Sequence, residues 1–146
     1  MKQVLAFLIC GFTLLLSSCR TGGVVLRETP LGVSETRRAV VSIIGEPRLV
    51  SENGRELFSK YYDKKGREIV KMDMVRERYS THVTILGDRR PYDIQVEVLV
   101  EDRDSDGGFE LTDRDDDKAA PIAEKIRKAL NQSLDNRNVI DDFRSF

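Results

Sequence analysis

Residues 92–101 alternate between apolar and polar side chains, and this alternation constrains the fold more than any other feature of the chain. The segment reads YDIQVEVLVE, with apolar residues at every even position and mostly polar residues between them. A period of two is that of a β-strand, whose successive side chains point to opposite faces of a sheet. The pattern predicts a strand in an antiparallel sheet, with one face buried and the other in contact with water.

Turn signals divide the preceding chain into segments of strand length. Asn53-Gly54 is typical of a type I′ hairpin turn, because both central residues of that turn need a positive φ. Residues 63–66 and 87–91, DKKG and GDRRP, predict two further reversals. The predicted strands are residues 48–51, 56–62, 67–74, 81–86 and 92–101. We expect the aromatic residues Phe58, Tyr61 and Tyr62 to pack in the core, with a recognition patch as the alternative.

Apolar residues recur at helical spacing after residue 116. They are Ala119, Ile122, Ala123, Ile126, Leu130 and Leu134. An aspartate at positions 115–117 can cap the start of such a helix, and Pro121 is compatible only with its first turn. The pattern predicts an amphipathic helix that covers the apolar face of the sheet and ends within the polar residues 131–138.

Residues 34–45 are compatible with two structures. Read as a helix, Ser34 is the N-cap, Val40, Ile43 and Ile44 share a stripe, and Gly45 ends the helix. Read as a strand, residues 39–44 form a β-branched run of the kind that is buried on both faces. The sequence alone leaves both structures open.

The N-terminus has the organisation of an export signal. Lys2 precedes an apolar run over residues 4–16, and the small residues Ser17 and Ser18 stand directly before Cys19. Thirteen residues of helix span only about 20 Å, which is short for a transmembrane segment. We therefore expect this segment to be cleaved.

The sequence Leu16-Ser17-Ser18-Cys19 resembles the lipobox of bacterial lipoproteins. The resemblance implies that the Cys19 sulfur carries diacylglycerol, that the signal is removed before Cys19, and that the new amino terminus is acylated, typically with palmitate. Cys10 would leave with the signal, so no disulfide is possible in the mature chain. In this family an aspartate after the cysteine retains the protein at the inner membrane. Arg20 stands there, which implies the outer membrane, on its periplasmic side.

The resulting domain organisation has four parts: residues 1–18 as the signal peptide, 19–33 as a lipid-anchored tether, 34–138 as a single domain and 139–146 as a tail. Removing the signal removes one of the 24 basic residues and none of the 25 acidic ones, so the net charge becomes about −2. A surface that binds nucleic acid needs a marked basic excess, and we expect no nucleic-acid partner.

An acidic segment follows the alternating strand. Asp102, Asp104, Asp106, Glu110 and Asp113 lie at the oxygen-ligand positions of a calcium loop, with Gly107 at its sharp turn. The departures from that motif are Asp113 in place of glutamate and a strand in place of the first helix. The alternative, which we prefer, is a hairpin turn at Asp106-Gly107 followed by a short strand over residues 109–112. We therefore assign no metal ligands.

The sequence offers no catalytic residues. His82 is the only histidine, and its alternation with Val83 and Ile85 places it with Ser80 and Thr84 on the polar face of a strand. A lone histidine lacks the partners that acid-base or nucleophilic catalysis requires. No phosphate-binding glycine loop, nucleophile elbow or Cys/His metal spacing is present. We expect neither an enzyme nor a bound cofactor.

These observations predict an α+β domain: an antiparallel β-meander sheet of about five or six strands packed by a C-terminal α-helix. We expect a non-catalytic lipoprotein of the cell envelope, anchored in the outer membrane through Cys19. It would act by presenting an interaction surface to an envelope protein partner. The alternative function is that of a calcium-binding periplasmic module that uses residues 102–113.

Overall fold

The computed structural model describes residues 22–143, and the side chains of residues 22–137. A six-stranded antiparallel sheet is packed by two α-helices, which confirms the α+β prediction. The elements in chain order are β1 (Val24–Thr29), α2 (Val33–Ile44), β2 (Leu49–Val50), β3 (Glu56–Phe58), the 3₁₀ helix η2 (Met72–Met74), β4 (Glu77–Leu86), β5 (Tyr92–Arg103), β6 (Phe109–Arg114) and α3 (Asp116–Phe143).

The long strand β5 organises the sheet. One of its edges pairs with β4, and its other edge pairs with β1 and then with β6, which follow one another along it. Strands β3 and β2 continue the sheet beyond β4. The register joins Val83 to Val96 and Ile85 to Ile94. Because directly opposed residues share a face, this register gathers the apolar side chains of β4 and β5 on one side.

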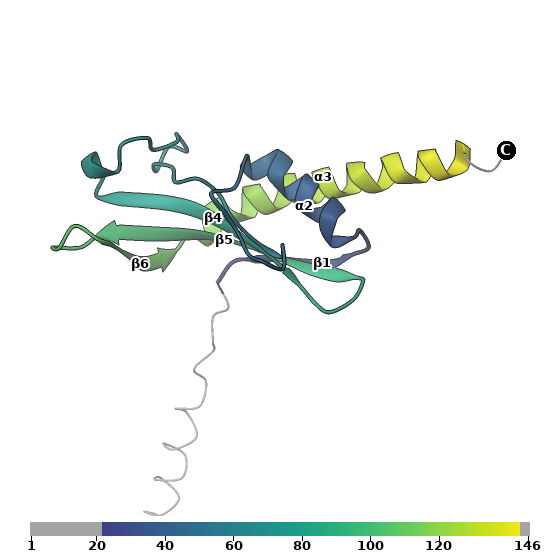
Figure 1. Ribbon diagram of the computed structural model, residues 1–146, viewed down its shortest axis with the longest axis horizontal. Coiled ribbons are helices and arrows are strands. Elements are labelled where there is room, and N and C mark those ends of the chain that lie inside the picture. The colour runs from purple at the N-terminus through teal and green to yellow at the C-terminus, as the bar shows by residue number, and fades with distance from the viewer. Residues whose placement is uncertain (1–21, 144–146) are drawn as a thin grey trace, which may run out of the picture.

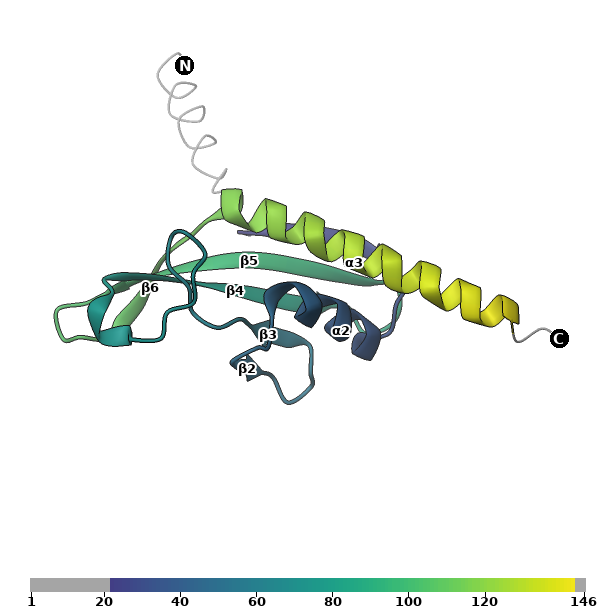
Figure 2. The same ribbon diagram turned by 90° about the horizontal axis from the view of Figure 1, so that it is seen from above.

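The predicted alternation in residues 92–101 is confirmed. Every even-numbered residue from Tyr92 to Val100 is buried, and the odd-numbered residues between them are partly exposed. Figure 1 shows why: α2 and α3 lie side by side on one face of the sheet, and the described chain leaves the other face uncovered. Figure 2 shows α3 following the length of the sheet and extending past its end.

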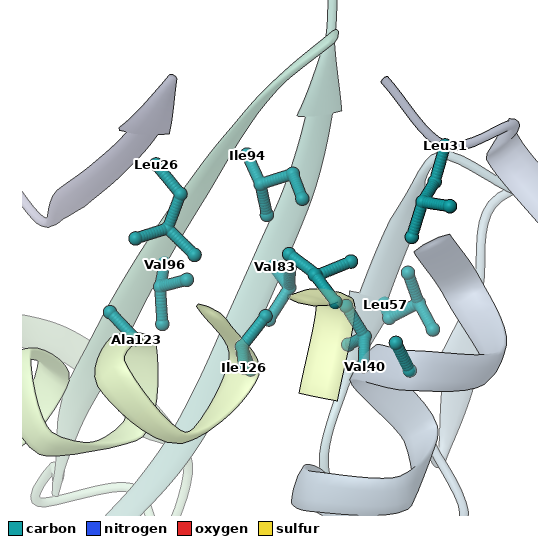
Figure 3. Packing of buried hydrophobic residues seen from close by; sticks show 11 residues of the cluster. Leu26, Leu31, Val40, Leu57, Val83, Ile94, Val96, Ala123 and Ile126 are labelled. Atoms are coloured by element: carbon teal, nitrogen blue, oxygen red, sulfur yellow. The ribbon is translucent and has the colours of Figure 1, made fainter. Parts of the chain in front are cut away.

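The main core lies between the sheet and the two helices (Figure 3). Ile126 of α3 and Val40 of α2 are fully buried against Val83, Ile94 and Val96 of the sheet. A smaller buried cluster, made of Tyr79, Val98, Val100 and Ala119, lies under the first turns of α3.

The segment that sequence analysis left ambiguous is the helix α2. Its buried residues Thr36, Ala39 and Val40 recur at helical spacing, which favours a helix once there is a sheet to cover. The N-cap is Gly32 and not Ser34: the Gly32 N–H donates to Glu35 Oε2 at 3.0 Å, and the Gly32 carbonyl accepts from Thr36 N–H at 2.9 Å. Gly45 ends the helix at φ +77°, as expected for a C-terminal glycine.

The expected tether is wrong from residue 24 onward, because Val24–Thr29 forms β1. Val24 pairs with Val96 and Leu26 with Ile94, and Leu26 is 4% exposed within the core. The domain therefore begins about ten residues earlier than residue 34. Two-residue alternation is hard to recognise in VVLRET, where two adjacent valines precede the buried leucine.

The hairpin at Asn53-Gly54 is present, but its turn is not type I′. The Gly54 N–H donates to the Ser51 carbonyl at 2.8 Å, and Gly54 has φ +68° whereas Asn53 does not have a positive φ. Asn53 instead uses its Oδ1 atom to accept hydrogen bonds from Ser51 Oγ at 2.7 Å and Arg55 N–H at 3.0 Å. The turn therefore spans four residues and ends at a glycine.

The predicted strand over residues 67–74 is wrong. The chain does reverse at residues 63–66, where the Gly66 N–H donates to the Asp63 carbonyl at 2.9 Å, but only the single bridge between Tyr62 and Glu68 follows. Residues 72–74 form η2 instead. Strand β4 pairs with one edge of β3 and β2 pairs with the other, so no edge of β3 is left for residues 67–74.

Helix α3 begins as predicted and ends later. Asp115 is its N-cap, with Oδ1 accepting from the Lys118 N–H at 2.9 Å. Pro121 is the sixth residue and lies in the second turn, not in the first as expected. It is exposed, and because proline has no N–H, the carbonyl of Asp117 lacks its usual partner in the helix. The helix continues through residues 131–138 to Phe143, so most of the expected tail is helical. In residues 22–143 we find no helix that is both long and apolar enough to cross a membrane.

Candidate functional site

We call the side of the sheet opposite α2 and α3 the open face. It carries the odd-numbered residues of β5 and the residues of the neighbouring strands that lie directly opposite them. Four of its apolar residues are among the six large hydrophobic residues that are notably exposed in the described chain: Val25 at 41%, Leu49 at 53%, Leu86 at 39% and Leu111 at 50%. The open face therefore has exposed apolar residues at several separate positions, and no helix within residues 22–143 covers it.

Arginine side chains stack on aromatic rings along one part of the open face. The guanidinium of Arg78 lies 3.8 Å from the ring centre of Tyr61 and 3.9 Å from that of Phe109. Arg48 lies 4.3 Å from the ring centre of Tyr61 on the other side. Arg78 Nε also donates to Glu101 Oε2 at 2.7 Å, and both side chains are only 15% exposed. Such a packed ion pair holds the stack rigid.

This stack was not predicted, for two reasons. The predicted strand begins at residue 81, whereas β4 starts at Glu77, and the aromatic residues were expected in the core. Only Tyr62 packs on the helix side, where it lies against the Tyr79 cluster. Phe58 and Tyr61 are half-buried on the open face. The sequence did contain one signal for this stack: the alternation that places Ser80 and His82 on one face extends back to Arg78.

His82 lies on the open face with Ser80 and Thr84, as predicted. Its Nδ1 atom is 3.2 Å from Glu97 Oε2, its Nε2 atom is 3.4 Å from Glu56 Oε2, and its ring stacks on Phe58 with 4.1 Å between centres. Glu97 is shared with Arg114, whose Nε lies 3.0 Å from Oε1. Both ring nitrogens thus face carboxylates, and the ring bridges three strands.

The helix side contains a groove of about 460 Å³ between the end of α2, the start of α3 and residues 59–68. Its apolar lining includes Ile43, Ile44, Tyr62 and Ile122, and charged residues at its rim include Lys60, Glu68 and Lys125. Burial raises the pKa of Tyr62, whose hydroxyl lies 3.1 Å from Thr81 Oγ1. We call this the helix-side groove.

An exposed apolar segment follows the groove in the chain. It is the stretch of residues 69–75, IVKMDMV, which sequence analysis expected in a strand. Val70 is 86% exposed and Met74 is 81% exposed, the highest values among the exposed large hydrophobic residues of the described chain. Exposed apolar residues of this kind are typical of protein contact surfaces.

The acidic segment forms the preferred hairpin turn. Asp104 Oδ1 accepts from the N–H groups of Asp106 and Gly108 at 3.0 and 2.7 Å, and Gly107 has φ +87°. Residues 109–114 then pair with β5 as β6, which places Asp113 opposite Val100 and about 10 Å along the strand from Glu110. The hairpin thus draws the carboxylates apart, and no group of three metal-ligating side chains occurs in the part of the chain that the structure describes.

Cys19, the predicted lipidation site, lies outside the described residues. The described chain begins three residues later, at Gly22, whose carbonyl accepts from Gln95 Nε2 at 3.0 Å. Gly23 follows with φ +98°, and a Cβ atom there would lie 2.7 Å from the Val96 carbonyl oxygen. The two glycines therefore fit the chain closely to β5, although they lie within the predicted tether of residues 19–33.

Comparison with protein-family models, curated proteins and solved structures finds no match to this chain.

Proposed function

We propose that this protein is a non-catalytic lipoprotein of the cell envelope, held at the outer membrane through acylated Cys19 and facing the periplasm. The observation that carries the proposal is the order of residues 1–19: one lysine, a short apolar run, two serines and a cysteine. Two or three acyl chains give a stable anchor, because each buried methylene contributes about 0.8 kcal/mol.

The protein acts by binding an envelope protein partner, and the helix-side groove together with residues 69–75 is the surface that supports this role best. An apolar lining bordered by lysine and glutamate side chains has the composition of a protein interface. Val70 and Met74 add apolar area that the chain itself does not bury. Met is well suited to such a role because its flexible side chain adapts to different partners.

The surroundings of His82 support a structural role for the only histidine. Its two nitrogens lie beside Glu97 and Glu56, and its ring is stacked on Phe58. A general base must have a nitrogen within reach of a substrate proton. For His82 to act as a base, one of its nitrogens would first have to leave its carboxylate neighbour in the sheet. We therefore propose that His82 stabilises the open face.

The anchor is tested by comparing the natural protein with Cys19→Ala. We expect the natural protein to sediment with membranes, and to show by mass spectrometry a chain that begins at Cys19 and carries acyl groups. Cys19→Ala should be released or left unprocessed. A natural protein with an intact leader or an unmodified sulfur would refute the proposal.

The partner surface is tested by photo-crosslinking in intact cells. A photoreactive residue at Lys60, on the rim of the groove, should give a discrete crosslinked band, whereas the same residue at exposed Lys128 on α3 should not. Equal crosslinking at the two positions would show that the groove is not the contact surface.

A further inference from the structure

We propose that the open face of the sheet lies against the membrane surface, so that the helix-side groove points away from the bilayer. This inference rests on the proposed lipid anchor at Cys19. It concerns a different question, namely which side of the domain the anchor holds toward the lipid.

The N-terminal end of the described chain, at Gly22, contacts side chains of the open face. The carbonyl of Gly22 accepts from Gln95 Nε2 at 3.0 Å, and a Cβ atom on Gly22 would lie 2.5 Å from Cδ of Arg114. A Cβ atom on Gly23 would lie 2.6 Å from Cγ of Glu97. Gln95, Glu97 and Arg114 all belong to the open face, since β5 directs its odd-numbered residues there and Arg114 pairs with Leu99. The Gly23 N–H also donates to Asp116 Oδ1, at the start of α3. The chain therefore leaves the domain at this edge of the sheet, with Gly22 and Gly23 against side chains of the open face.

Only a short segment connects Gly22 to the lipidated Cys19. Cys19 is three residues from Gly22, and three residues of extended chain span at most about 11 Å. A helix packed on a sheet lies about 10 Å from it, and its outer surface is about 5 Å further. The Gly23 N–H donates to Asp116 Oδ1 at 2.8 Å, so the chain lies beside the first residue of α3. Lys128 lies twelve residues, or about 18 Å, further along this helix. The connection is therefore too short to bring a lipid to the outer surface of α3 at Lys128. Figure 1 shows both helices on the side away from the open face.

The exposed side chains of the open face are compatible with a lipid surface. Its exposed apolar residues Val25, Leu49, Leu86 and Leu111 come from four different strands and so are spread across the face. Its buried charges are already paired within the sheet. A face with exposed apolar residues on several strands, and with its buried arginine paired, can lie against the polar and charged headgroup layer of a membrane. Arginine stems such as that of Arg114, 47% exposed, also suit the headgroup layer.

The experiment uses the full, naturally processed protein with one added cysteine that carries an environment-sensitive fluorophore. Leu111→Cys and Leu49→Cys place the probe on the open face, and Lys128→Cys places it on exposed α3 as the matched control. Cys19 is acylated in this protein and does not react with the dye. Each variant is reconstituted into phosphatidylcholine vesicles that contain a phospholipid with a nitroxide quencher near the headgroup.

We expect the probes at positions 111 and 49 to be quenched at least threefold more strongly than the probe at position 128. Equal quenching at the three positions, or stronger quenching at 128, would overturn the inference while leaving the anchor intact. Weak quenching at 111 and 49 together with a dimer by chemical crosslinking would also overturn it, because a second copy would then cover the open face.

A second measurement tests the short connection as the cause. Ten glycine and serine residues inserted after Thr21 should reduce the difference between positions 111 and 128 by at least half, because the longer chain no longer fixes the side presented to the bilayer. An unchanged difference would contradict the argument from length. Protein that stays in the supernatant without acyl groups would overturn the anchor and this inference together, and flotation with mass spectrometry identifies that outcome separately.

Discussion

Truncation of Ile126 is the sharpest test of the core described above. The side chain is fully buried and joins α3 to β4 and β5 in the main cluster. Ile126→Ala removes three carbon atoms, worth about 2.4 kcal/mol of transfer free energy at about 0.8 kcal/mol each. The cavity that remains adds to this, so we expect a loss of about 3 to 4 kcal/mol in the free energy of unfolding. Ile126→Val removes one methyl group and should cost about 1 kcal/mol.

The assay is urea unfolding at neutral pH of a form without residues 1–18 that carries Cys19→Ala, followed by circular dichroism. Lys128→Ala is the control, since this side chain is exposed on the same helix and should change the stability by less than about 0.5 kcal/mol. A loss below about 1 kcal/mol for Ile126→Ala, with an unchanged denaturant slope, would refute the packing of α3 on the sheet.

Four further predictions concern single features of the structure. Asp115→Ala should lower the unfolding free energy by about 1 kcal/mol at pH 7 by removing the N-cap. Because hydrogen bonds and the charge of Lys118 lower the pKa of Asp115, this difference should disappear as the pH falls through that pKa, and a constant difference down to pH 2 would contradict the assignment. Gly23→Ala should destabilise the domain by about 2 kcal/mol or more, and by more than Gly107→Ala, which has a similar φ of +87° but no atom within 4 Å of the added Cβ; equal losses in thermal melts would refute the close fit to β5. Burial and the hydrogen bond to Glu77 raise the pKa of Tyr79 to about 12, so the natural protein should lose more stability than Tyr79→Phe between pH 10 and pH 12, as measured by urea unfolding at each pH. Millimolar calcium should leave the melting temperature unchanged, in the natural protein and in Asp104→Ala combined with Asp106→Ala; a rise in the natural protein alone would favour the calcium-binding alternative.

Local periodicity and turn chemistry are enough to predict several elements of this fold. The alternation in residues 92–101 predicts β5. Side chains of a strand with one buried face alternate with a period of two, whichever strands pair with it. The apolar spacing from Ala119 to Leu134 gives α3 for the same kind of reason. The hairpin at residues 104–108 follows from an aspartate that satisfies backbone N–H groups and a glycine at positive φ.

Other features depend on which strand edges and sheet faces remain free once the chain has folded. Residues 24–29 become a strand because β5 offers an edge beside β6, and residues 67–74 do not because β4 and β2 already occupy the two edges of β3. Residues 34–45 become helical because the sheet needs a cover on one side. The stacking of Arg78 between Tyr61 and Phe109 joins residues far apart in the chain. Such contacts are set by strand pairing over long sequence separations, which local patterns do not encode.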